Sequence, residues 1–263
     1  MTGCGAPMTM NAPATPRRAP VPLLLLAALL AGGTPAPGQD RGREVTFRVL
    51  CFEHVGGLTS AYAQAAGKEG GKVEVPLFTS EFSGEFKGLF AGGKASLFTE
   101  EPGPDGKPAR KVVAQGPLAN APRQAFILVP ATAPAAGLVY QIVAWDDRES
   151  AFPMGGTRVV NFAPFPVRLH LAGADLPPIP PGGSRVYPQV KAVDEWNMYS
   201  VRIDFATAAD TWVPVATQSW KASPRKRDWV ITRFNPANRQ PVIRLYQDVP
   251  PWRLPKLPAP APR

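Results

Sequence analysis

Along Val45-Thr46-Phe47-Arg48-Val49-Leu50-Cys51, apolar side chains occupy every second position. This period of two predicts a β-strand that turns Val45, Phe47 and Val49 into a core and leaves Arg48 on a solvent face. The same alternation recurs along Val201–Phe205, where the odd positions are apolar and the even positions are charged. Strands with one buried and one wet face are typical of antiparallel sheets.

Short runs of this kind fill most of the chain. The 33 prolines and 24 glycines are spread between them, which favours turns that join many short strands. Strands are predicted at 45–52, 72–78, 94–99, 111–115, 124–129 and 138–145, and again at 157–162, 167–171, 185–190, 199–205, 211–217, 228–234 and 242–247. The best helix candidate is Leu58–Ala66, a segment of about two turns.

The two sets of strands share an internal repeat. Arg48–Phe52 and Arg158–Phe162 both contain Arg-Val-x-x-Phe, at a shift of 110 residues. Near the other end of each set, Pro122-Arg123 and Pro224-Arg225 both precede an apolar strand. The agreement in order and spacing favours duplication of one unit, and a chance likeness between β-rich segments is the alternative.

Each unit has about the length and strand number of an antiparallel β-sandwich of roughly 100 residues. We therefore predict an all-β protein with little helix, made of two tandem Ig-like β-sandwich domains at 44–147 and 156–249. The segment Arg158–Pro164 resembles the start of exported bacterial β-sandwich domains of unknown function. This resemblance implies an extracytoplasmic module and no particular activity.

Residues 1–38 are typical of a secretory signal peptide. Two arginines precede the apolar run Val21–Ala31, which is shorter than the ~20 residues that cross a bilayer. Small residues favour cleavage after Gly38 or, alternatively, near Gly33, and a buried core helix is the alternative for the run itself. We expect an exported protein, periplasmic, at the cell surface or secreted, with no transmembrane segment in the mature chain.

Removal of the predicted signal peptide changes both the net charge and the number of cysteines. The whole chain has a net charge of +9, and removal of 1–38, whose charged residues are Arg17 and Arg18, leaves +7. Cys51 is then the single cysteine, so no internal disulfide can form. Its apolar neighbours predict a buried thiol.

Catalytic and metal-binding patterns are missing from the sequence. His54 and His170 lie in no metal-ligand spacing, and both are expected on exposed strand faces. The carboxylates of Asp146–Glu149 could serve calcium binding or glycoside cleavage, but Arg148 among them favours a solvated loop between the domains. We therefore expect no catalytic residue, no metal and no other cofactor, which favours a protein that is not an enzyme.

A basic segment, 221–227, is flanked by tryptophans, and a Pro-rich basic tail, 250–263, follows the last predicted strand. Such interleaving of bases and aromatics fits nucleic acid in cytosolic proteins, but export favours an anionic envelope polymer or another envelope protein as the partner. The alternative is a hairpin turn with solvated basic side chains. The candidate ligand-binding residues are Trp220, Arg225, Lys226, Arg227 and Trp252.

These features together predict an exported, non-enzymatic protein with a structural, adhesion or assembly role in the cell envelope. The alternative is a carbohydrate-binding or carbohydrate-active protein that stacks sugars on exposed aromatic rings. The candidates for such stacking are Trp145, Trp196, Trp212, Trp220 and Trp252.

Overall fold

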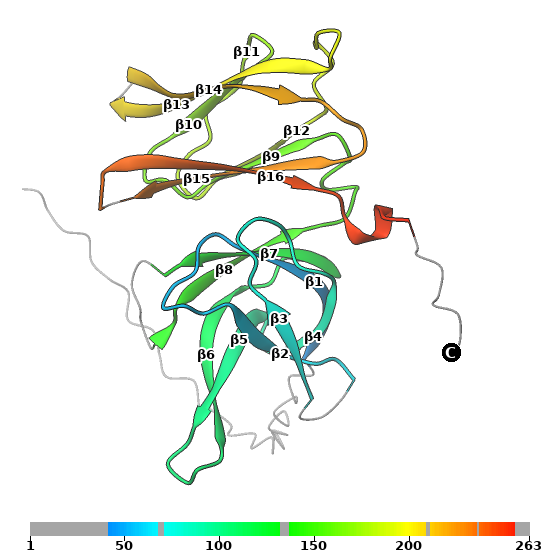
Figure 1. Ribbon diagram of the computed structural model, residues 1–263, viewed down its shortest axis with the longest axis vertical. Helices are drawn as coiled ribbons and strands as arrows, with labels where there is room; N and C mark the ends of the chain where they lie inside the picture. The colour runs from blue at the N-terminus through cyan, green and yellow to red at the C-terminus, as the bar shows by residue number, and fades with distance from the viewer. Residues whose placement is uncertain (1–41, 68–70, 132–136, 209–210, 236, 256–263) are drawn as a thin grey trace, which may run out of the picture. The chain divides into compact units, whose positions relative to one another are not determined.

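The computed structural model describes residues 42–67, 71–131, 137–208, 211–235 and 237–255, which belong to one compact unit. The predicted signal peptide, 1–38, and the end of the tail, 256–263, lie outside the described residues. The described part of the chain is nearly all β, as predicted, and the 3-10 turn η2 (Pro251–Arg253) follows its last strand (Figure 1).

Sixteen strands follow one another along the described chain. In the first half they are β1 (Arg43–Cys51), β2 (Ser60–Gln64), β3 (Lys72–Pro76), β4 (Phe86–Phe90), β5 (Lys94–Pro102), β6 (Pro108–Pro117), β7 (Arg123–Pro130) and β8 (Tyr140–Asp146). In the second half they are β9 (Thr157–Asn161), β10 (Val167–Leu171), β11 (Ala174–Asp175), β12 (Ser184–Tyr187), β13 (Met198–Ala208), β14 (Thr211–Lys221), β15 (Arg227–Asn235) and β16 (Gln240–Asp248).

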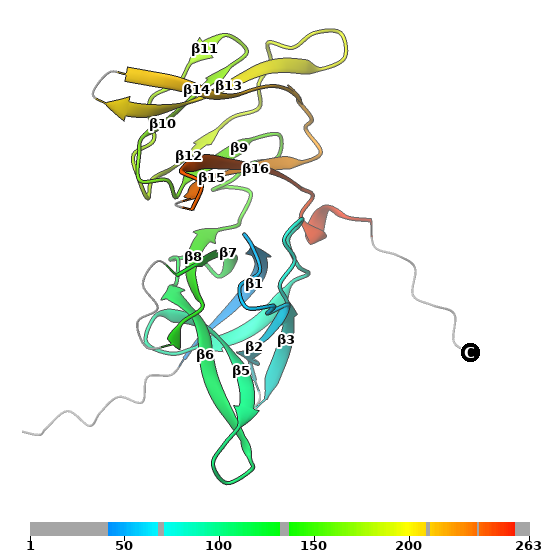
Figure 2. The ribbon, with the colours of Figure 1, turned by 60° about the vertical axis from the view of Figure 1, so that its left-hand side comes forward.

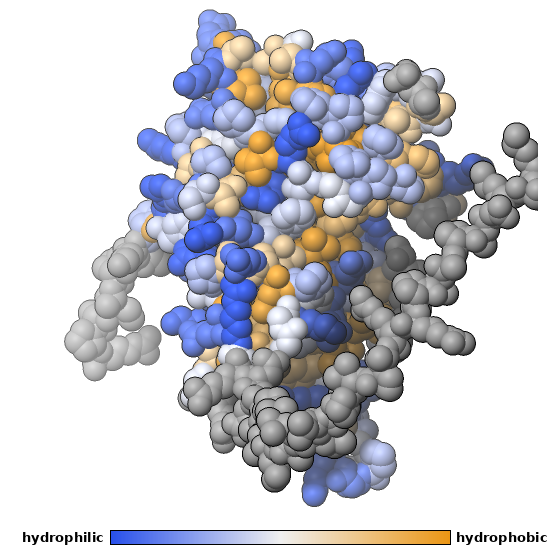
Figure 3. All heavy atoms as spheres, turned by 180° about the vertical axis from the view of Figure 1, so that it is seen from behind, coloured by the Kyte–Doolittle hydropathy of each residue, from blue (hydrophilic) through white to orange (hydrophobic). Residues whose placement is uncertain are grey.

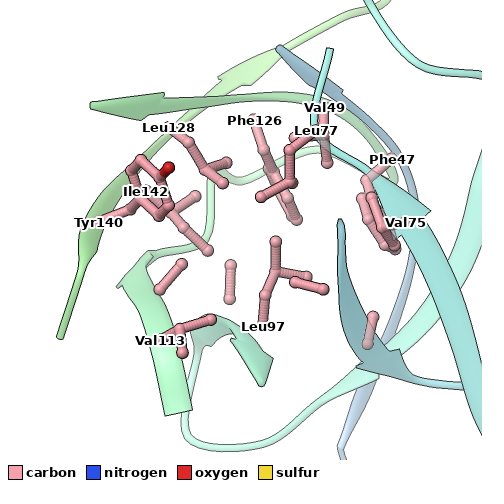
Figure 4. Close-up of a cluster of buried hydrophobic side chains, with 14 of the residues drawn as sticks. Phe47, Val49, Val75, Leu77, Leu97, Val113, Phe126, Leu128, Tyr140 and Ile142 are labelled. Carbon is pink, nitrogen blue, oxygen red and sulfur yellow. The ribbon is translucent and has the colours of Figure 1, made fainter. Parts of the chain in front are cut away.

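The first half is one eight-stranded sheet in the order β3-β2-β5-β6-β8-β7-β1-β4. The sheet curls until its two ends approach each other, because Ala65 beside β2 forms a bridge with Gly88 of β4. Apolar side chains fill the space inside the curl, among them Phe47, Leu97 and Phe126 (Figure 4). The predicted inward face of β1 therefore lies in this core.

The second half consists of two separate four-stranded sheets. Their orders are β11-β10-β13-β14 and β12-β9-β15-β16, and a buried apolar cluster lies between them (Figures 1 and 2). The order differs from the immunoglobulin arrangement, in which the first strand pairs with the second. Here β9 pairs with β12 and, in parallel, with β15.

The two halves have the same strand order. In the first half, β3-β2-β5-β6 corresponds to β11-β10-β13-β14, and β8-β7-β1-β4 corresponds to β16-β15-β9-β12. The single parallel contact of the first strand falls on the seventh strand in both halves. A bulge also follows Leu97 in β5 and Ile203 in β13, at corresponding points of the two hairpins.

The register of the strands matches residue by residue and corrects the alignment made from the sequence. The corresponding pairs are Phe47 opposite Gln124 in the first half and Thr157 opposite Asp228 in the second. One residue earlier in β7 and β15, Arg123 therefore corresponds to Arg227. The shared Pro-Arg motif had instead aligned Arg123 with Arg225. The motif misled the alignment because the loop before β15 is two residues longer.

The helix predicted at Leu58–Ala66 is wrong, because this segment contains β2. Ala61 and Ala63 are buried on alternate positions, which is the pattern of a strand, while Tyr62 between them is half-buried. Two turns of helix have little stability of their own. Pairing with β3 and β5 therefore decides the conformation.

Candidate functional site

The five candidate ligand-binding residues do not share one surface. Trp220 is buried in the core of the second half, and Arg225 is exposed. Lys226 forms an ion pair of 2.6 Å with an aspartate two positions along β15. Arg227 and Trp252 come together, with the guanidinium carbon 5.5 Å from the ring centroid. The structure thus brings two of the five into one cluster, at the junction between the halves.

A closed network of two arginines and two aspartates lies at this junction. Nε and Nη2 of Arg48 donate to Asp147 at 3.0 and 3.2 Å, and its Nη1 and Nη2 donate to Asp248 at 2.8 and 2.9 Å. Nη2 of Arg227 donates to Asp147 at 2.7 Å and to Asp248 at 2.6 Å. None of the four residues is more than 4% exposed. Each arginine therefore binds an aspartate of its own half and one of the other half, and the four charges cancel.

Two of these residues were expected in water. Arg48 stands on the face of β1 that alternation assigns to solvent, and Asp147 lies in the acidic loop that was expected to be solvated. Both expectations are wrong, because the second half of the chain covers this face. Arg48 is 1% exposed and Asp147 is 0% exposed. Alternation separates the two faces of a strand, but it does not show what covers each face.

Apolar side chains surround the network and come from equivalent positions of the two halves. Leu50 and Ile127 of the first half pack in one buried cluster with Val160 and Ile231 of the second. The register makes Leu50 the counterpart of Val160 and Ile127 the counterpart of Ile231. The same face of the same sheet thus contributes from both sides of the junction.

The network controls the ionisation of its own members. Burial would lower the pKa of Arg48, but hydrogen bonds and charges of Asp248 and Asp147 outweigh burial and raise it. Burial would likewise raise the pKa of Asp248, but Arg48 and Arg227 hold it below its usual range. The folded state therefore favours the charged form of both groups.

Trp252, in η2, lies over the network. Its ring centroid is 4.1 Å from the guanidinium carbon of Arg123 and 5.4 Å from that of Arg48. Its Nε1 donates to Glu149 at 2.9 Å. A side-chain hydrogen bond from Arg253, with that of Trp252 adding to it, lowers the pKa of Glu149 to about 2. The first residues of the Pro-rich tail are thus anchored to the chain itself.

Arg158 is the counterpart of Arg48 in the second half, but it has different partners. Its guanidinium carbon lies 5.0 Å from the ring of Phe152 and 5.3 Å from that of Trp229. No ion pair of Arg158 is found among the described residues. Burial, followed by the charge of Arg227, lowers its pKa to about 10. Aromatic rings, a hydrogen bond of 3.1 Å from its Nη2 to the carbonyl of Ala151, and the charges of Asp147 and Asp146 favour this cation.

A small cavity of about 230 Å³ opens beside the network. Ser83 contributes a hydroxyl group to the wall of this cavity. The hydroxyl oxygen accepts a hydrogen bond from the backbone N–H of Val49 at 2.8 Å, and the hydroxyl donates one to the carbonyl of Gly84 at 3.2 Å. Both contacts are with the backbone, so no base activates this hydroxyl as a nucleophile.

His170 forms a second charged cluster, on the outer face of β10 and β13. It was expected to be exposed, which is wrong: it is 7% exposed. Its Nε2 lies 2.6 Å from Asp204, and its Nδ1 contacts Asp175. Arg168 and Arg202 also pair with Asp204, at 2.9 and 3.1 Å. Charged side chains from neighbouring strands thus cover the imidazole ring, and each ring nitrogen contacts a carboxylate. His54, in contrast, is exposed as expected.

No protein-family model matches the sequence, and no curated protein matches it significantly. Within the described residues, no group of three histidine, cysteine or acidic side chains is placed to hold a metal ion, and no helix is long and apolar enough to cross a membrane.

Proposed function

We propose that this protein is an exported, non-enzymatic protein of two tandem β-sandwich domains that acts as one rigid structural, adhesion or assembly module in the cell envelope. The junction carries the proposal. Its four buried charges bind one another across the two halves, and its apolar cluster draws on equivalent faces of both. A role that requires the two halves to keep one arrangement fits these buried contacts between the halves better than catalysis does.

Duplication of one ancestral domain is part of the proposal. The matching strand order, register and bulge position support it. The junction supports it as well, because the same face of each half meets the other, which is the arrangement in a symmetric homodimer. Fusion of such a dimer into one chain would give the observed pairing of equivalent residues.

Export is tested by fractionating bacterial cells that express the full chain with a C-terminal tag. We expect the tagged protein outside the cytoplasm and without residues 1–38, as mass spectrometry of its N-terminus would reveal. A variant lacking Val21–Ala31 should stay in the cytoplasm at full length. Recovery of the intact natural chain from the cytoplasm would reject export.

The rigid-module part is tested by unfolding the chain from residue 39 in urea. If the junction joins the halves into one cooperative unit, far-ultraviolet circular dichroism and tryptophan fluorescence should report one coincident transition. Two separate transitions would mean that the halves fold independently, and the proposed rigid module would be rejected.

The carbohydrate alternative receives less support from the positions of the tryptophans. Trp196 is 70% exposed, whereas Trp220 is buried. The guanidinium carbon of Arg168 lies 4.5 Å from the ring centroid of Trp212 and covers one face of this ring. A glycan array probed with the mature chain separates the two functions, because binding to a glycan, lost on Trp196→Ala, would favour the alternative.

An anionic envelope polymer remains the proposed partner for the exposed bases. Arg225 and Arg253 line one cavity of about 480 Å³ together with Met154 and Leu254. Co-sedimentation with dextran sulfate tests this surface. Arg225→Glu should weaken binding several-fold, and the same change at the exposed Arg110 of the first half should weaken it less.

A further inference from the structure

The two halves differ at one seam, where the sixth and eighth strands meet. In the first half, β6 pairs with β8, through Ala114 opposite Tyr140 and Gln115 opposite Gln141. In the second half, the corresponding β14 and β16 are edge strands of separate sheets. Both lie on the side where the first half is closed.

Two substitutions explain why the seam closes only in the first half. A Cβ atom on Gly116 would lie 1.8 Å from the carbonyl oxygen of Ile142, so close pairing of β6 and β8 requires glycine there. The bulge and the register place Gln218 and Pro241 at the positions of Gly116 and Tyr140. A glutamine side chain obstructs the approach, and proline offers no N–H group for a ladder bond.

The open seam holds an apolar cavity of about 300 Å³ between the two sheets of the second half. Two apolar residues of its wall, Phe205 and Val213, lie opposite each other on β13 and β14. At the corresponding positions the first half has Thr99 opposite Lys111. Val213 is 43% exposed, although it belongs to this wall. Exposed apolar side chains gathered at one cavity mark an interaction site more often than a defect of packing. Figure 3 shows that hydrophobic residues also reach the surface elsewhere, among hydrophilic ones.

The outer edge of β14 has the chemistry of a strand that accepts another. Residues 212–220, Trp-Val-Pro-Val-Ala-Thr-Gln-Ser-Trp, contain no charge. Edge strands in natural proteins usually carry charges, are short or are covered, because an uncharged edge pairs with other chains. A strand 11 residues long with one proline, Pro214, has little of this protection.

Arg239 and Tyr140 indicate what the occupant contains. Among the described residues of the cavity wall, Arg239 is the one that carries a charge, so it complements an acidic group. At the corresponding position of the closed seam, Tyr140 is 0% exposed, whereas the second half has Pro241. An aromatic side chain therefore fills the first core at the point where the second has a cavity.

We propose that the seam between β14 and β16 binds an extended peptide strand of a partner protein, which pairs with the edge of β14, places an aromatic side chain in the cavity and offers a carboxylate to Arg239. This is strand addition, in which main-chain hydrogen bonds provide affinity and the pocket selects the side chain. The inference rests on the proposed assembly role, because it gives that role a class of partner.

The probe is a phage-displayed library of random nine-residue peptides, panned against the chain from residue 39. Enriched sequences should share alternating apolar residues, an aromatic residue and an acidic residue. The strongest peptide, made synthetically, should bind at least tenfold more weakly when its aromatic residue is replaced by alanine. Methylation of alternate backbone nitrogens on one edge should abolish binding, because strand addition needs those N–H groups.

Val213→Lys is the decisive variant, since it introduces the lysine that the first half has at this position. We expect at least tenfold weaker binding of the peptide and an unchanged circular dichroism spectrum. Val112→Lys is the matched control, because Val112 is 40% exposed on β6 of the first half and lies outside the open seam between β14 and β16. It should leave binding unchanged.

Three outcomes would overturn the proposal: no enriched peptide, equal binding by wild type and Val213→Lys, or a dimer of the chain that Val213→Lys dissociates. The last would mean that a second copy occupies the seam. Export is measured separately by fractionation. A cytoplasmic protein that still binds the peptide would reject export and leave the docking site standing, and the reverse result would reject the docking site alone.

Discussion

Removal of Arg48 should destabilise the folded protein strongly, because its charge is balanced inside a buried network. Arg48→Met keeps much of the side-chain volume but deletes four hydrogen bonds, two to Asp147 and two to Asp248. Arg227 is then the one arginine of the network, facing both carboxylates. The buried network changes from neutral to a net charge of −1, and breaking a buried pair in this way costs about 3–5 kcal/mol.

The loss is measured by urea unfolding and by thermal melting of the chain from residue 39. For a chain of this size, about 2–4 °C of melting temperature is lost per kcal/mol, so a decrease of about 6–20 °C is expected. Arg148→Met is the matched control, because Arg148 pairs with Asp146 in water, with 49% of its side chain exposed. A surface pair of this kind contributes about 0–1 kcal/mol.

A double variant distinguishes loss of charge balance from loss of contacts. Arg48→Met with Asp248→Asn leaves one arginine and one aspartate in the network, which restores neutrality. The double variant should therefore be more stable than Arg48→Met alone, although it lacks one more charged group. A loss below about 1 kcal/mol for Arg48→Met, or simple addition of the two single losses, would refute the reasoning.

Three further predictions follow from single residues. Gly116→Ala should destabilise the chain by about 1–3 kcal/mol or more, because the added Cβ has no room beside β8. Gln218→Ala at the open seam should lower the free energy of unfolding by less, and urea unfolding measures both values. The contact of Glu149 with Trp252 should be complete above pH 4.5 and be lost as the pH falls toward 2, because the folded-state pKa of Glu149 is lowered to about 2. The difference in fluorescence between the natural chain and Trp252→Phe measures this loss. A fluorescence difference that stays constant between pH 5 and 2 would contradict the prediction. The thiol of Cys51 is buried and burial raises its pKa, so a disulfide reagent should label it only after unfolding, and fast labelling of the native chain would contradict its burial.

The alternation of residues predicted the apolar, buried face of several strands, but the charged face of β1 and Asp204 on the charged face of β13 are buried as well. Val201–Phe205 lies within β13, with its odd positions buried, and Cys51 is buried as expected. Alternation failed where short segments carry little pattern. Strand β4 was not predicted, because Phe86–Phe90 is short and interrupted by glycine, and β2 was mistaken for a helix. Their conformations depend on the strands they pair with.

The candidate site could be predicted only in part. Arg227 and Trp252 were identified as a basic residue and an aromatic residue, and they do lie together. Their surroundings could not be predicted, because Arg48 and Asp248 are 200 residues apart in the chain and the repeat motif that contains Arg48 does not indicate its partner. A buried ion pair has no local sequence signature, since the same residues at the same spacing are stable in water.

By itself, the sequence determined that the described chain is nearly all β, which face of several strands is apolar, and that two segments share a pattern. Local side-chain chemistry is sufficient for these, because the strand period and the turn residues act over a few positions. The tertiary structure alone decided that the charged face of β1 is buried, that Arg123 corresponds to Arg227, and that one seam is closed and the other open. Each of these depends on contacts between residues far apart in the chain: the burial of a charge depends on what covers it, and the pairing of two strands depends on whether a glycine or a larger residue lies between them.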